Sequence, residues 1–320
     1  MRRFSLNQIL ISLIGLQLLL SVLTLMPRQR PAQTAQPLWI FNGDQVVSLI
    51  IEDSTGSKVL LSQRAGTWVL PSADDYPADA TKINSFLQKL STLKTDRLIT
   101  QTATSHRRLQ VDAKNFNRRV SITQNDGTQY TLYIGSSPSG GAVHIRLDGQ
   151  NQVYLTNQIT AWDANAAASG WIDTAYLMLT SAEITGVEIQ NTNGILKFNR
   201  TAENDWQTAA SIPAEKMLNS NALNTLVSRL STLRMVAPLG KTLKPEYGLN
   251  PPRATVTLTR KDGSNIRLEV GEAQNGSQNY AVYASTSQYA VLVSSFSVED
   301  LLNATLNDYL EDIPTPTPTP

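Results

Sequence analysis

Two stretches of this sequence repeat the same pattern of apolar residues 140 positions apart. The first is Ile83–Leu93 (INSFLQKLSTL) and the second is Leu223–Leu233 (LNTLVSRLSTL). In both, apolar side chains recur with the 3.6-residue period of an amphipathic helix that buries one face. The residues around each stretch follow in the same order, so we expect a duplicated folding unit with this helix at its centre.

The segments that flank each predicted helix indicate antiparallel strands. Asp126-Gly127, Asp148-Gly149 and Asp262-Gly263 stand between alternating apolar segments, and Asp-Gly supplies the positive φ angles that tight hairpin turns require. For the first unit we predict strands at Val47–Ile51, Lys58–Gln63, Arg119–Thr123, Gln129–Ile134, Ala142–Leu147 and Gln152–Thr156. For the second we predict them at Ile184–Gln190, Ile195–Arg200, Ala254–Thr259, Asn265–Val270, Tyr280–Ala284 and Tyr289–Val293.

Smaller signals complete each unit. Asp79 or Thr81 is the expected N-cap of the first helix and Ser220 that of the second, since short polar side chains accept hydrogen bonds from free helical amides. Short helices are expected to close the units, within Thr160–Leu179 and at Val298–Leu310.

The amino terminus is predicted to cross a membrane. No residue from Phe4 to Pro27 is charged, and Ile9–Met26 is rich in Leu, Ile and Val. As a helix, this segment would extend about 27 Å, close to the ~30 Å hydrocarbon core of a bilayer. A secretory signal peptide is the alternative, but its apolar region is usually shorter. We therefore expect an uncleaved signal anchor that contacts the lipid bilayer through Ile9–Met26.

The expected fold class is α+β, with an N-terminal transmembrane helix followed by two tandem repeats, each a mainly antiparallel sheet packed on one central helix. Residues 1–26 would form a cytoplasmic stub and the anchor, and residues 27–44 a proline-containing linker. The repeats would occupy residues 45–179 and 180–310, and residues 311–320 a disordered Pro-Thr tail. The expected location is the inner (cytoplasmic) membrane, single-pass, with most of the chain outside the cytoplasm.

Composition excludes several kinds of site. The chain has no cysteine, which rules out disulfides, thiolate zinc sites and a cysteine nucleophile. Its net charge is +1, and no stacking aromatics are interleaved with its basic residues, so we expect no nucleic-acid partner.

No arrangement of catalytic residues is evident in the sequence. The only histidines are His106 and His144, and no G-x-S-x-G elbow exists. Asp74-Asp75 with Asp79 could in principle bind a hard cation, but the spacing fits no EF-hand loop. Gly135–Gly141 lacks the Gly-Lys-Ser/Thr ending of a phosphate-binding loop and precedes a strand. We therefore predict no catalytic, metal-binding or cofactor-binding residues, and no cofactor.

One local excess of positive charge is the candidate interaction site. Its members are Arg107, Arg108, Lys114, Arg118 and Arg119. They could contact an acidic partner surface or anionic lipid headgroups, or they could form an ordinary solvated loop. Trp68 and Trp206, at matching places in the two units, are expected in the core, with a glycan-binding platform as the alternative.

An ordered set of motifs resembles the bacterial domain of unknown function 4340 family over Val46–Leu310. Gly66-x-Trp68, Leu90–Leu93 and Ile134-Gly135 can be laid on Trp206, Leu230–Leu233, Tyr247-Gly248-Leu249-x-Pro251 and Val270-Gly271. In the first copy Arg107–Val111 replaces the tyrosine-glycine-leucine-x-proline element. The resemblance implies tandem copies, similarity to auxiliary components of gliding-motility-type ABC transporters and a non-catalytic envelope role, with no catalytic or cofactor residues.

These observations lead to one main hypothesis and two alternatives. The protein is expected to be a non-catalytic, membrane-anchored extracytoplasmic adaptor or accessory protein of an envelope complex, with ABC transporter membrane subunits as the expected partners. An envelope glycan- or lipid-binding module is the first alternative. A hydrolase that uses His106 and His144 is a remote one.

Overall fold

The computed structural model describes residues 13–17, 21, 36–95, 97–138, 140–274, 276 and 278–313. Within this part of the chain, no helix combines the length and the apolar character needed to cross a bilayer. The predicted fold class, which began with a transmembrane helix, is contradicted by this finding, and so is the predicted single-pass location in the inner membrane. Most of Ile9–Met26 lies outside the described residues, as does the Pro-Thr segment from residue 314 onward.

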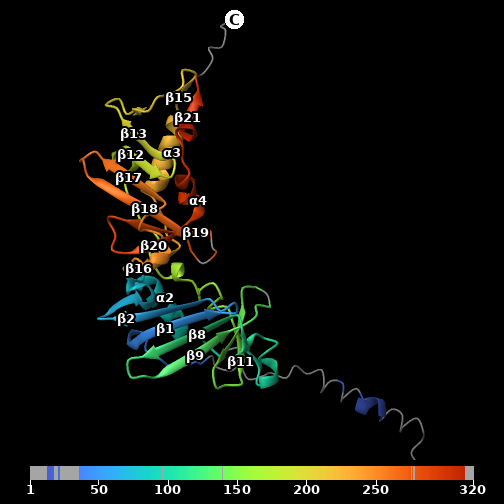
Figure 1. Cartoon of the computed structure of the whole chain (residues 1–320). Helices are drawn as coiled ribbons and strands as arrows, with labels where there is room; N and C mark the ends of the chain where they lie inside the picture. Colours follow the sequence, from blue (N-terminus) through green and yellow to red (C-terminus); the bar gives the residue numbers. More distant parts are fainter. Residues whose placement is uncertain are drawn as a thin grey trace, which may run out of the picture.

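The first sheet is formed by the blue to green part of the chain in Figure 1. All its strand pairs are antiparallel. In spatial order its strands are β4 (Tyr76–Pro77), β3 (Thr67–Leu70), β2 (Lys58–Arg64), β1 (Val46–Asp53), β8 (Arg118–Gln124), β9 (Gln129–Ile134), β10 (Val143–Leu147), β11 (Val153–Thr156) and β5 (Leu98–Thr100).

The second sheet, in the yellow to red part of the chain, is also antiparallel throughout. Its strands are, in spatial order, β14 (Trp206–Gln207), β13 (Gly194–Arg200), β12 (Ile184–Asn191), β17 (Ala254–Arg260), β18 (Asn265–Ala273), β19 (Asn279–Ala284), β20 (Ala290–Ser294) and β16 (Ala237–Gly240). Apart from the extra edge strand β4, the two sheets have the same order, and in both the strand after the central helix closes the far edge. We call each sheet with its helix a unit.

One helix covers each sheet: α2 (Ala80–Ser91) in the first unit and α3 (Ser220–Ser231) in the second. Asp79 caps α2 as predicted, because its carboxylate accepts hydrogen bonds from the amides of Thr81 and Lys82. The predicted cap Ser220 is wrong, since it is the first helical residue and Asn219 provides the cap. Each helix buries four apolar side chains, namely Ile83, Phe86, Leu87 and Leu90 in α2 and Leu223, Leu226, Val227 and Leu230 in α3.

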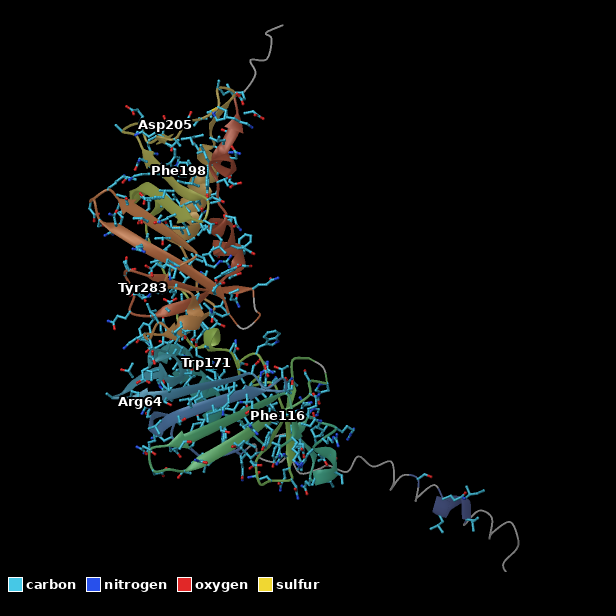
Figure 2. All side chains as sticks on the ribbon, in the orientation of Figure 1. Arg64, Phe116, Trp171, Phe198, Asp205 and Tyr283 are labelled. Carbon is cyan, nitrogen blue, oxygen red and sulfur yellow. The ribbon has the colours of Figure 1, made fainter. Side chains whose placement is uncertain are left out.

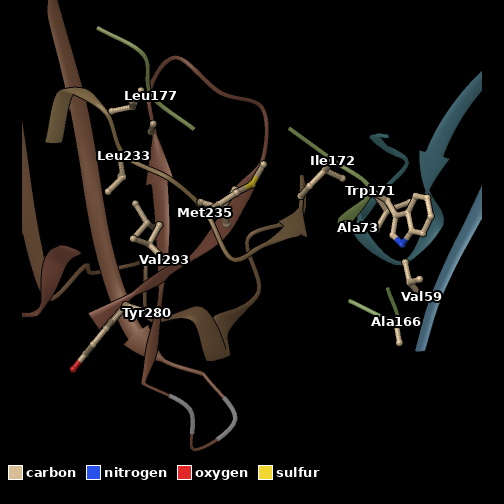
Figure 3. Packing of buried hydrophobic residues seen from close by; sticks show 14 of the residues in the cluster. Val59, Ala73, Ala166, Trp171, Ile172, Leu177, Leu233, Met235, Tyr280 and Val293 are labelled. Carbon is tan, nitrogen blue, oxygen red and sulfur yellow. The ribbon is translucent and has the colours of Figure 1, made fainter. Parts of the chain in front are cut away.

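A single cluster of buried apolar residues runs through both units. Figure 3 shows Val59, Ala73 and Trp171 packed together beside the first sheet, and Leu233 and Met235 within the second unit. Burial of one such large apolar side chain stabilises the fold by about 1.5–3 kcal/mol. Each helix is therefore held in place mainly by the apolar side chains that it packs against its own sheet.

The segments that close the units are less regular than expected. Within Thr160–Leu179 the structure has only a 3₁₀ turn, η4 (Ala168–Gly170). Where a helix was expected at Val298–Leu310, the chain forms α4 (Ser295–Val298) and the 3₁₀ turns η7 (Glu299–Leu302) and η8 (Leu306–Tyr309). It ends with β21 (Leu310–Asp312), which pairs with β15 (Lys216–Leu218). Of these short elements, η8 has a capping box, in which Thr305 and Asp308 exchange hydrogen bonds.

A polar and aromatic contact joins the two units. Asp74 Oδ2 accepts hydrogen bonds from the amides of Lys241 (2.7 Å) and Thr242 (3.1 Å). The rings of Tyr76 and Tyr289 pack edge to face, with centroids 4.7 Å apart. Tyr176 donates to Tyr289 O (2.8 Å) and accepts from Ala284 N (2.8 Å), and burial raises its pKa to about 12. The phenol therefore stays protonated at neutral pH and keeps its donor.

The Asp74 contact predicts a pH-dependent stability. Hydrogen bonds from the amides of Thr242 and Lys241 hold the pKa of Asp74 below its ordinary value. Such a carboxylate stabilises the fold above its unfolded-state pKa of ~3.9, and this contribution is lost as the pH falls through the lower folded-state pKa. We expect Asp74→Asn to lower the thermal unfolding midpoint at neutral pH and to have a vanishing effect in acid. Calorimetry across this range would contradict the contact if the difference between variant and native chain stayed constant.

Candidate functional site

Three of the five cations predicted to form an interaction site stand exposed on one surface of the first unit. Arg107 and Arg108 follow the 3₁₀ turn η3 (Ala103–Ser105), and Lys114 lies in the turn between β6 (Val111–Asp112) and β7 (Asn115–Phe116). Asn115 Nδ2 donates to Arg107 O (2.8 Å), which holds this hairpin beside the arginines. No described acidic residue forms an ion pair with these three side chains, which we call the basic triad.

The other two predicted cations are engaged within the fold. Arg118 donates from Nε to Ala164 O (2.9 Å) and from one terminal nitrogen to Asn117 O and Oδ1 (both 2.9 Å). Arg119 is paired with Glu52 on the neighbouring strand, and its guanidinium lies 5.0 Å from the centroid of the Phe116 ring. The structure therefore separates the predicted cluster into an exposed triad and two structural arginines.

Buried hydrogen bonds fix the loop that presents the triad. Arg146, buried on β10, donates from Nε to Val111 O (2.7 Å) and from another nitrogen to Leu147 O (3.1 Å) and Gln150 O (3.0 Å). Beneath the hairpin lies a small apolar cluster of Leu109, Val111, Phe116, Tyr133 and Val153. Figure 2 shows Phe116 in the first unit, on its far side from the second sheet. The triad thus projects from a surface that is held in place from below.

Both histidines are buried and bonded to the backbone. His106 Nε2 lies 2.9 Å from Asn151 O, and His144 Nδ1 lies 2.9 Å from Ser136 O and 3.1 Å from Ser136 Oγ. A carbonyl only accepts hydrogen bonds, so the imidazole nitrogen that faces it carries the proton. His144 Nδ1 then cannot act as the base for the Ser136 hydroxyl, and the pair does not form an activated nucleophile.

Two of the three acidic residues considered for metal binding have structural roles. Asp79 caps α2, and Asp74 receives two amides of the second unit. The described residues include no group of three potential ligands placed to hold a metal ion. Ser136 and Ser137 lie on the connection of the β9–β10 hairpin, where the Ser137 hydroxyl donates to Ala142 O (2.8 Å).

Trp68 and Trp206 are buried, as expected for core residues. The Trp206 indole donates to Asn224 Oδ1 on α3 (3.0 Å), and Arg200 lies 4.5 Å above its ring. Neither ring is available as a platform for a ligand.

Each unit has a cleft between its central helix and its closing segment, which the sequence did not indicate. The helix contributes Lys82, Ser85, Phe86 and Lys89 to a cleft of about 230 Å³ in the first unit. At positions 140 residues later, Ala222, Thr225, Leu226 and Arg229 line a cleft of about 510 Å³ in the second. In both, an ion pair crosses the cleft, Lys89 to Asp163 (2.6 Å) and Arg229 to Asp300 (2.5 Å). The shared arrangement holds the closing segment against the helix.

The Asp163 carboxylate is the best-connected polar group of the first cleft. Besides Lys89, it accepts hydrogen bonds from Thr160 N and Oγ1, both at 2.8 Å. Burial alone would raise the pKa of Asp163, but the bonds from Lys89 and Thr160 outweigh it and lower the pKa below its ordinary value. Asp163 is therefore ionised at neutral pH.

Comparison with protein families gives one match. The family described as Domain of unknown function (DUF4340) matches residues 68–252, more than half of the 320-residue chain. The chain belongs to this family. The match begins at Trp68 on β3 of the first sheet and ends just before β17 of the second. Because one match extends across both units, it gives no support to a separate copy of the family in each, or to a similarity with ABC transporter components. No curated protein and no solved structure matches the chain.

Proposed function

We propose that the protein is a non-catalytic adaptor that binds an acidic surface of a partner protein through the basic triad. The observation that carries this proposal is the exposure of three adjacent cations without described acidic partners, on a loop held by the buried Arg146. Arg118 and Arg119, only a few residues away, are satisfied by the fold. Such a local surplus favours an external anionic partner over an internal structural role.

Charge complementarity suits an adaptor. Positive and negative patches that face each other accelerate association and reject wrongly charged partners, and salt screens the attraction over about 10 Å at 0.1 M. The net charge of the chain is only +1, so the attraction would be confined to this surface and would orient the partner. The backbone contacts of His106 and His144 leave no catalytic pair that would favour an enzyme.

A membrane subunit of an ABC transporter is the proposed partner, an assignment that rests on the implied similarity of relatives of this family to auxiliary components of such transporters. Crosslinking of the full chain in its native cell, followed by affinity isolation, should recover the permease subunit reproducibly. Repeated recovery of no transporter subunit would overturn this assignment. Triad-dependent binding to vesicles containing anionic lipid, without any crosslinked protein, would instead show a lipid-binding surface and contradict the adaptor.

A further inference from the structure

Trp162 is the exception among the five tryptophans of the chain. The other four are buried, with at most 7% of their surface exposed, whereas 88% of Trp162 is exposed. A large aromatic ring in water forgoes the stabilisation that burial would give it. Trp162 stands at the edge of the first cleft, directly before Asp163. Its place on the lining of the cleft leaves the indole available to contact a ligand outside the fold.

The turn that presents Trp162 is held by bonds on both of its sides. Asp163 Oδ2 accepts from the amide and the hydroxyl of Thr160, and Asp163 Oδ1 accepts from Lys89 Nζ on α2. These bonds tie the residues on either side of the indole to each other and to the helix. The ring is consequently presented at a defined place without being packed.

The floor of the cleft is formed by two packed aromatic side chains. The rings of Phe86 and Trp171 pack edge to face, with centroids 5.2 Å apart, and Trp171 Nε1 donates to Asn165 O (2.7 Å). Gly170 allows the Asn165 side chain to lie against the backbone, since a Cβ at Gly170 would come within 2.8 Å of Asn165 Nδ2. Asn165 Oδ1 accepts from Ala167 N (2.8 Å), which fixes the orientation of this side chain where it lines the cleft.

We propose that this cleft binds a pyranose ring of a glycan, stacked on Trp162. A pyranose has one face of C–H groups and a rim of hydroxyls. The C–H face carries slight positive charge and suits the negative face of an indole. Around the ring, Lys89, Asp163 and Asn165 supply donors and acceptors for the hydroxyls.

Size and charge agree with this ligand. At about 230 Å³ the cleft is smaller than the ~300–1,000 Å³ of sites for drug-sized molecules, so it accommodates one ring rather than a long apolar ligand. Two lysines and one aspartate line it, which gives a slight positive balance and suits neutral or mildly acidic sugars. In the second unit no tryptophan lines the equivalent cleft, and Tyr309 is buried, so the proposal concerns the first unit alone.

A glycan array probed with the full chain tests the proposal, followed by titration of the best oligosaccharide against intrinsic fluorescence. We expect saturable binding and a shift in tryptophan emission, with at least 10-fold weaker binding by Trp162→Ala. Phe296→Ala is the matched control, because Phe296 is a similarly exposed aromatic on α4, 84% exposed, and should bind normally.

Three results would overturn the glycan site. The first is that the native full chain binds no glycan, and the second is that Trp162→Ala binds glycan as tightly as the native chain does. The third is that Trp162→Ala loses a crosslinked partner protein rather than a bound sugar. An unchanged unfolding midpoint for Trp162→Ala would show that the side chain was removed without unfolding. Charge reversal of the basic triad should leave sugar binding intact, so this proposal fails or stands independently of the adaptor function.

Discussion

Replacing Gly271 by alanine is expected to lower the free energy of unfolding by about 3 kcal/mol, the upper part of the range for overpacked sites. A Cβ at this position would lie 2.0 Å from Tyr247 O and 3.0 Å from the Gly248 carbonyl group. These obstacles are backbone atoms of the segment that crosses the end of β18, so no side-chain rotation can relieve the clash. Gly135 is in the same situation, with Leu109 O at 2.1 Å.

Denaturant titration of Gly271→Ala and of a control, Gly43→Ala, measures this effect. At Gly43 the nearest atom to a new Cβ is Leu87 Cβ, at 3.7 Å, so we expect a change within about 0.5 kcal/mol. If both variants unfolded at the same denaturant concentration as the native chain, the close crossing over β18 would be wrong.

Arg146→Met should destabilise the protein by a similar amount, about 3 kcal/mol, since hydrogen bonds from a charged donor contribute ~1.5–3 kcal/mol. The substitution would strip the carbonyls of Val111, Leu147 and Gln150 of this donor and remove the cation that lies 4.6 Å from the Tyr133 ring centroid. Because Val111 belongs to the hairpin whose turn carries Lys114 of the basic triad, hydrogen exchange should quicken there first.

Arg64→Met provides the comparison for Arg146→Met. Arg64 is an exposed arginine whose nearest carboxylate oxygen, on Asp75, is 3.8 Å away, and exposed ion pairs contribute ~0–1 kcal/mol. Equal stability losses in the two variants, or unchanged exchange in the hairpin of Arg146→Met, would show that Arg146 does not hold the triad loop.

The central helices could be predicted because their signal is local. The spacing of Ile83, Phe86, Leu87 and Leu90 identifies the buried face without knowledge of the sheet beneath it, and Asp79 identifies the start. The end was placed two residues late, since Leu93 and Leu233 are buried although both helices end at a serine. An apolar residue just beyond a helix continues its periodicity, so the sequence alone does not separate the two.

The equivalence of the two segments that lie against Gly135 and Gly271 could be recognised only from the structure. The sequence pairs Leu109 with Leu249, but the structure pairs Leu109 with Tyr247. The carbonyls of these two residues approach Gly135 and Gly271, and the residues after them, Gln110 and Gly248, have φ angles of +57° and +61°. A non-glycine residue with positive φ hides the equivalence, because the sequence signal for this turn is normally glycine or asparagine.

The candidate sites were predictable only in part. A run of basic residues marks a surface, but which cations stay free depends on acceptors far away in the sequence, such as Ala164 O for Arg118 and Glu52 for Arg119. Trp162 was missed because a lone tryptophan usually signals a core position. Its polar neighbours Thr160, Asp163 and Asn165 indicate an exposed position only weakly.

The most direct test of the adaptor function is the amount of partner protein that the full chain recovers after crosslinking when the triad is reversed in sign. We expect Arg107→Glu, Arg108→Glu and Lys114→Glu together to reduce recovery at least 10-fold, and added salt to weaken recovery by the native chain. The control carries the same charge change at three exposed lysines elsewhere, Lys58, Lys94 and Lys261, and should recover the partner normally. Equal recovery by the triad variant and this control would contradict the proposal.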